Sequence, residues 1–156
     1  MSRPKPEKQP ESQLDGFLSK YDPAIRVLAE QARERLRALL PGAIEMVYDN
    51  YNALVIGYGP TERVPEAILS IALYPRWINL YFLDGVGLPD PEGLLKGSGT
   101  RVRRILLEDI STLDKPAVRT LIRYAVKQAD SPFNRKAPIR LIIKSISAKQ
   151  RSRRPA

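Results

Sequence analysis

Short runs of β-branched and aromatic residues fill the middle of the chain, and they constrain its fold more than any other feature. Five such runs, each bounded by turn-forming residues, cover residues 44–48, 53–58, 67–74, 77–83 and 102–107. The first two are joined by Asp49-Asn50-Tyr51-Asn52 and the next two by Pro75-Arg76, and strands with short connections pair antiparallel. Helical patterns lie before and after these runs. We therefore predict an α+β fold in which an antiparallel sheet of about five strands packs, in two layers, against N-terminal and C-terminal helices.

Three helices are predicted around this sheet. Apolar residues at helical spacing over residues 14–21 predict a short first helix, which should end before Pro23. Asp22-Pro23 is a start signal for a second helix that ends near Pro41-Gly42. The charged face of this second helix includes Arg33 and Arg37 and is expected to be solvated. A third helix begins near Pro116 and ends near residue 130.

Residues 139–147 fit two structures. Ile139, Leu141 and Ile143 alternate as in an edge strand, whereas Ile139, Ile142, Ile143 and Ile146 match one face of a helix. Periodicity leaves both open.

Composition divides the 156 residues into three parts. Prolines among charged residues predict a flexible lead-in over residues 1–12. The predicted α+β domain covers residues 13–130, and a basic C-terminal extension covers residues 131–156. A chain of this length is sufficient for one domain with a buried core.

Basic residues are concentrated in the C-terminal extension. The chain has 26 Lys and Arg against 17 Asp and Glu, and residues 131–156 hold eight of these cations and no acid. Such an extension can attract polyanions, because each neutralised phosphate releases counterions, or it can serve only to keep the chain soluble. The residues expected to contact an anionic ligand or nucleic acid are Arg135, Lys136, Lys149, Arg151, Arg153 and Arg154.

The chain contains no cysteine and no histidine. This excludes disulfides, Cys or His metal ligands, and catalysis in which an imidazole or a thiolate is the base or nucleophile. A carboxylate, tyrosine or lysine with a shifted pKa could still serve as a general base. An enzyme acting on a small anionic substrate is therefore an alternative to the non-enzymatic protein without a cofactor that we expect. No apolar run approaches the roughly 20 residues of a membrane span, and residues 1–10 lack the apolar core of a secretory signal. Cytoplasmic residence without a membrane partner is the expectation, and the oligomeric state is left open.

A glycine-rich segment, residues 84–104, is the first candidate binding site. It holds five of the nine glycines in the chain, and glycine allows the backbone to approach a ligand closely. Its amides and hydroxyls can face an anion while basic residues add charge, although the pattern matches neither a Walker loop nor a dinucleotide fingerprint. A plain glycine turn before the fifth strand is the alternative. The predicted ligand-binding residues are Lys96, Gly97, Ser98, Gly99, Thr100, Arg101 and Arg104.

Aromatic residues just before this segment extend the candidate site. Four of them, Tyr74, Trp77, Tyr81 and Phe82, lie within nine positions. Strand alternation places Trp77, Asn79 and Tyr81 on one face, where the rings can stack on bases or on a planar ligand. Ordinary burial in the core is the alternative. Together with the loop, Trp77 and Tyr81 predict a binding module for a phosphate-bearing small molecule or nucleic acid.

Acidic residues in the same segment raise the question of a metal site. Asp84, Asp90 and Glu92 offer oxygen atoms that hard cations accept, but their spacing matches no ligand motif. Asp90 lies between two prolines, where a carboxylate typically accepts hydrogen bonds from backbone amides of a turn. No metal ligand is predicted from these residues.

The order of these segments resembles a known family. The run Trp77-Ile78-Asn79-Leu80-Tyr81-Phe82, then Gly85, then Leu88-Pro89-Asp90-Pro91-Glu92-Gly93-Leu94-Leu95, then Gly97-x-Gly99 and the arginines over residues 101–104, is similar to the YdhG-like family, the domain of unknown function numbered 1801. The resemblance covers residues 14–130. It implies a small α+β domain whose activity is not settled.

Some members of that family are similar in fold to frataxin and have been discussed as intracellular iron chaperones, which is the alternative function that the resemblance implies. Frataxin-like iron handling uses an acidic ridge on the first helix and adjoining strand. Here Glu30 and Glu34 alternate with arginines such as Arg33, and cations within a Debye length weaken the attraction of carboxylates for a metal ion. No residue is carried over as an iron ligand.

Overall fold

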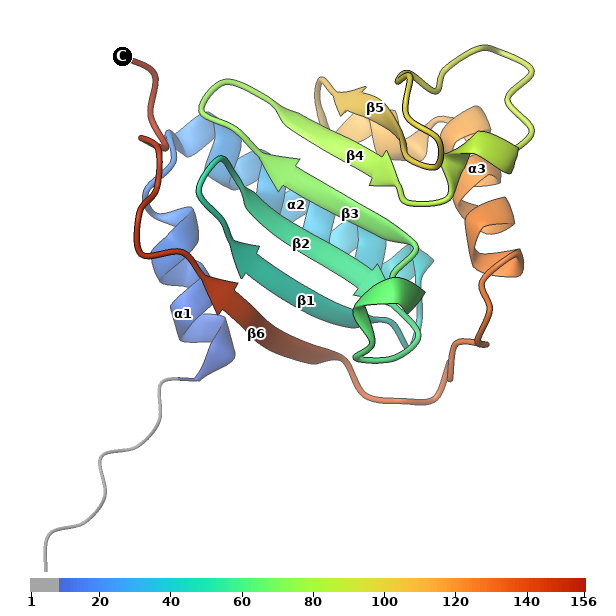
Figure 1. Ribbon diagram of the computed structural model, residues 1–156, viewed down its shortest axis with the longest axis horizontal. Helices are drawn as coiled ribbons and strands as arrows, with labels where there is room; N and C mark the ends of the chain where they lie inside the picture. The colour runs from blue at the N-terminus through green and yellow to red at the C-terminus, as the bar shows by residue number, and fades with distance from the viewer. Residues whose placement is uncertain (1–8) are drawn as a thin grey trace, which may run out of the picture.

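A computed structural model describes residues 9–156. Its α-helices are α1 (Pro10–Leu18), α2 (Pro23–Leu39) and α3 (Pro116–Lys127). Its strands are β1 (Ile44–Asp49), β2 (Leu54–Gly59), β3 (Leu69–Leu73), β4 (Ile78–Phe82), β5 (Arg103–Leu107) and β6 (Arg140–Ile146). The predicted two-layer α+β fold is confirmed, with six strands in place of about five (Figure 1). Of the predicted lead-in, residues 1–8 lie outside the described residues, and residues 10–12 form the first turn of α1.

The sheet has the strand order β5-β4-β3-β2-β1-β6. The first five strands pair antiparallel in chain order, as the short connections predict for β1–β2 and β3–β4, and the sixth pairs parallel with β1. Residues 140–146 therefore form an edge strand and not a helix. The basic extension is thus part of the same sheet, and residue 130 marks a change in charge and not the end of the fold.

One face of the sheet is covered and forms the core. Helix α2 runs behind the strands in Figure 1, and its buried residues Ala29, Ala32 and Leu36 belong to the core cluster together with Leu121 and Ile122 of α3. Alternate strand residues complete the cluster: Val47, Ile56, Ile71, Leu80 and Ile105. Because successive side chains on a strand point to opposite faces, the other residues of each strand point to the face without a helix.

That second face, which we call the open face, is turned toward the viewer in Figure 1. Two rows of paired residues cross it. One row consists of Met46, Gly57, Ser70, Tyr81 and Arg104, and the other of Tyr48, Val55, Ala72, Asn79 and Leu106.

The connection from α3 to β6 is held against the end of α2. Gly42 has φ +85°, a conformation that L side chains rarely adopt. A Cβ atom there would collide with the carbonyl group of Asn134, so glycine allows the connection to pass directly over this turn. Phe133 in the same connection packs partly buried against the core.

Candidate nucleic-acid interface

Three predicted site residues lie side by side on the open face. Tyr81 of β4 is paired with Arg104 of β5. Lys96 extends this ladder by one residue, because its amide donates to the Arg104 carbonyl at 2.9 Å and its carbonyl accepts from the Arg104 amide at 2.8 Å. Directly paired residues of antiparallel strands project to the same face. Tyr81, Arg104 and Lys96 therefore form a continuous row of one aromatic and two basic side chains.

Aromatic rings continue this row toward the turn between β3 and β4. The rings of Tyr74 and Trp77 are stacked, with centroids 5.0 Å apart and planes at 21°. The hydroxyl groups of Tyr74 and Tyr81 are 3.4 Å apart, and the Asn79 side-chain amide donates to Tyr81 at 3.3 Å. Trp77 is 44% exposed, so its ring is a surface group rather than part of the core.

The tyrosine next to Trp77 is uncharged at neutral pH. Partial burial, together with the hydrogen bond to Tyr81, raises the pKa of Tyr74 to about 12. A tyrosine is already neutral near pH 7, and the raised pKa keeps this hydroxyl group neutral at higher pH as well.

The two cations of the row are not neutralised within the described part of the chain. Over residues 9–156, neither Lys96 nor Arg104 forms an ion pair, and the Lys96 ammonium donates only to the Gly93 carbonyl, at 3.3 Å. Nη1 of Arg104 lies 3.6 Å from the position that a Cβ atom would take at Gly97. The guanidinium group is thus beside the glycine loop.

The glycine loop has a braced base and a free tip. The Asp90 carboxylate accepts hydrogen bonds from the amides of Leu94 and Leu95 at 2.8 and 2.9 Å, which is the turn role predicted for it. Arg103 donates to the Gly99 carbonyl at 2.6 Å. The backbone amides of residues 97–100 donate to no acceptor within residues 9–156, and these four residues are exposed.

Arg101, another predicted site residue, is exposed but paired with a carboxylate outside this row. Its Nε donates to the Asp84 carboxylate at 2.8 Å, and the two form an ion pair. Sequence spacing placed Arg101 beside Lys96, but the attraction of a carboxylate 17 positions earlier turns the side chain away. The acids Asp84 and Asp90 do not share a site, because Asp84 pairs with Arg101 and Asp90 accepts from the loop amides.

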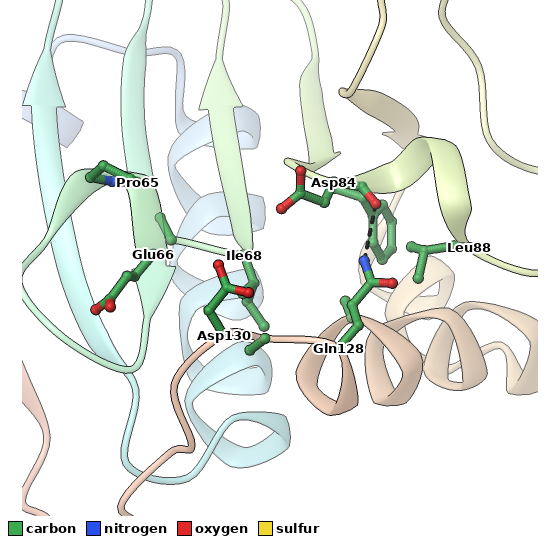
Figure 2. Close-up of a pocket in the computed structure, with 11 residues that line it drawn as sticks. Pro65, Glu66, Ile68, Asp84, Leu88, Gln128 and Asp130 are labelled. Atoms are coloured by element: carbon green, nitrogen blue, oxygen red, sulfur yellow. Dashed lines mark hydrogen bonds between the residues drawn. The ribbon is translucent and has the colours of Figure 1, made fainter.

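An acidic hollow lies near Asp84, at the end of α3. Figure 2 shows Asp84 and Asp130 on opposite sides of it, with the Gln128 side chain donating to the Asp84 carbonyl at 3.1 Å. Glu66, also in its lining, accepts from Thr61 and Ser131, and these hydrogen bonds lower the pKa of its carboxyl group. Within residues 9–156, no group of three or more acidic side chains is arranged to hold a metal ion.

The basic extension is used partly inside the molecule, which corrects another prediction. The Arg153 side chain is only 3% exposed and lies 3.0 Å from Asp49, so it cannot contact a partner. Arg154 pairs with Asp22 at 2.8 Å, and Arg151 lies over the ring of Tyr51. Arg135, Lys136 and Lys149 are exposed.

A buried charged cluster was missed by the sequence analysis. Glu45, on the covered face of β1, accepts from Arg33 at 3.0 Å, from Arg37 at 2.8 Å and from the Tyr58 hydroxyl at 2.7 Å. Burial raises the pKa of Tyr58 well above its usual value. The two arginines, expected on a solvated face, lie over the sheet instead. The sequence feature that could have indicated this cluster is Glu45, the single acid in the apolar run 44–48.

No protein-family model, curated protein or solved structure matches this chain. The resemblance to the YdhG-like family therefore stays a prediction. Within residues 9–156, no helix is both long enough and apolar enough to cross a bilayer.

Proposed function

We propose that this protein is a non-enzymatic binding module that holds single-stranded nucleic acid on the open face of its sheet. The observation that carries the proposal is the row Tyr81, Arg104 and Lys96, which adjoins the stacked pair of Tyr74 and Trp77. In this role Trp77 and Tyr81 stack on bases, and Arg104 and Lys96 contact phosphates.

The chemistry of the row suits this ligand better than a duplex. Base stacking on aromatic side chains contributes about 1–3 kcal/mol per base, but it requires bases whose faces are free, and a duplex hides them. Phosphate binding is most favourable at cations that have no intramolecular ion pair, because no existing ion pair has to be broken. Lys96 and Arg104 meet this condition, and Arg101 does not.

The glycine loop adds contacts for a phosphate group. Amides that face solvent can donate to phosphate oxygens without losing a hydrogen bond in the protein. The amides of residues 97–100 are of this kind, and Gly97 among them lies beside the Arg104 guanidinium group. A phosphate-bearing small molecule would use the same amides, so a mononucleotide serves as a competitor in the experiment below.

Neutralising the two cations of the row is expected to weaken binding strongly. We expect the double variant Lys96→Gln, Arg104→Gln to bind a labelled single-stranded oligonucleotide at least about tenfold more weakly than the parent at low salt. The slope of log affinity against log salt concentration should fall by about 1.4, because two phosphate contacts are removed and each contributes about 0.7 on a single strand. Fluorescence anisotropy with the full chain measures both quantities, with single-stranded RNA, single-stranded DNA, duplex and mononucleotide compared.

The matched control is Arg123→Gln, Lys127→Gln, which also removes one Arg and one Lys, from exposed positions on α3. This control should keep the parent affinity. Equal losses in both double variants, or equal affinity for duplex and single strand, would contradict the proposal. Residues 131–156 are not deleted in this design, since they include β6 and the buried Arg153.

A further inference from the structure

A groove of about 630 Å³ lies on the helical side of the molecule, between the end of α2, α3 and the connection that follows α3. Its lining is mainly apolar, with Leu39 from α2, Ile122 and Val126 from α3, and Pro132 and Phe133 from the connection. Small-molecule pockets are typically concave, mostly apolar and roughly 300–1,000 Å³ in volume. This groove has both properties, and it is separate from the open face.

The groove is built by the fold and is not a chance gap between loops. The connection after α3 is seated on Gly42, where only a glycine leaves room for Asn134. A turn follows at once, since the amide of Ala137 donates to the Asn134 carbonyl at 2.9 Å. Phe133 packs partly against the core. The wall opposite α3 is therefore held in place by backbone contacts.

Positive charge surrounds this apolar lining. Arg123, Lys127 and Arg135 lie at its edge, and none of the three forms an ion pair within residues 9–156. Arg123 donates only to the Thr120 hydroxyl, at 3.0 Å. A fourth cation, Arg119, is already paired with Asp114. The lining contains one carboxylate, Asp130.

We infer that this groove binds a single-chain amphiphile with an anionic head group, such as a fatty-acid carboxylate. The acyl chain lies along Ile122, Val126 and Phe133, where its burial removes apolar surface from water. The carboxylate lies among Arg123, Lys127 and Arg135, whose charges it complements in charge-assisted hydrogen bonds. The volume of about 630 Å³ and the three cations without an ion pair fit one acyl chain that carries a single anionic head group.

Calorimetry with the full chain and dodecanoate, below the concentration at which it forms micelles, tests this inference. Dodecanoate is expected to bind, acetate is not, and dodecyltrimethylammonium should bind about tenfold or more weakly, because it has the same chain and the opposite charge. Equal binding of the cationic amphiphile would overturn the charge assignment. Binding to anionic vesicles without binding of monomeric dodecanoate would show a membrane surface as the target and would also overturn the inference.

Matched variants locate the site. The double variant Arg123→Gln, Lys127→Gln should lose about tenfold or more in dodecanoate affinity, and Lys96→Gln, Arg104→Gln should bind it like the parent. All four substituted residues are exposed. Circular dichroism of each double variant should therefore match that of the parent. Amide NMR shifts should change at Val126 and Phe133. Shifts confined to the open face, or equal affinity of both variants, would contradict the site, and neither result bears on nucleic-acid binding.

Discussion

Replacing Glu45 by alanine is expected to lower the free energy of unfolding by about 3–5 kcal/mol, the usual cost of removing one partner from a buried ion pair. The Glu45 side chain is 1% exposed and accepts hydrogen bonds from two arginines and from Tyr58. Without it, the buried Tyr58 hydroxyl loses its acceptor, and Arg33 and Arg37 keep only the outer carboxylate of Glu11. Urea denaturation of the full chain measures the loss.

The control for this variant is Glu34→Ala, in which an exposed acid on α2 is removed. Surface substitutions of this kind change stability by no more than about 0.5 kcal/mol. A double-mutant cycle with Tyr58→Phe separates the hydrogen bond from general effects, because Tyr58→Phe should cost less once Glu45 is absent. Equal losses for Glu45→Ala and Glu34→Ala would show that the buried cluster does not stabilise the fold.

Replacing Arg153 by alanine is also expected to lower the free energy of unfolding by about 3–5 kcal/mol. This guanidinium group is buried between Asp49 and the carbonyl groups of Asn50 and Tyr51. After its removal, Asp49 keeps only Lys20, at 3.8 Å, as a counter-charge. The end of the chain should also loosen, so hydrogen exchange at Arg151, whose amide donates to the Tyr51 carbonyl, should become faster.

Two further variants make this result specific. Arg153→Lys should recover only part of the stability, since an ammonium group cannot reproduce the planar fork of a guanidinium group. Arg151→Ala, two residues earlier on the exposed side, should cost less than about 1 kcal/mol. If Arg153→Ala were as stable as the parent, the extension would not be anchored through this residue, and its charges would be free for a partner.

Local patterns in the sequence predict most of this fold. The β1–β2 and β3–β4 hairpins follow from short connections, and the start of α2 follows from Asp22-Pro23. The parallel pairing of β6 with β1 does not follow, because periodicity within residues 139–147 carries no information about a strand nearly a hundred positions earlier. Charge density in the extension likewise could not predict a buried arginine, whose partner Asp49 is 104 positions away.

Local patterns in the sequence also predict part of the candidate site. Strand alternation places Asn79 and Tyr81 on one face, as in the structure, and the glycine content indicates a loop with accessible amides. The ion pair of Arg101 with Asp84 could not be predicted, because the two residues are 17 positions apart in the sequence. The groove beside α3 was not predicted, since it depends on how the connection after α3 folds back over Gly42.

The most direct test of the proposed function uses Trp77, the only tryptophan in the chain. Its fluorescence is followed while unlabelled single-stranded oligonucleotide is added to the full chain. Stacking of a base on the exposed indole ring should quench the fluorescence, with the same midpoint as the anisotropy titration, and Lys96→Gln, Arg104→Gln should move both midpoints to higher concentration. Binding seen by anisotropy with unchanged Trp77 fluorescence, or no binding at low salt, would contradict the assignment of the open face as the nucleic-acid interface.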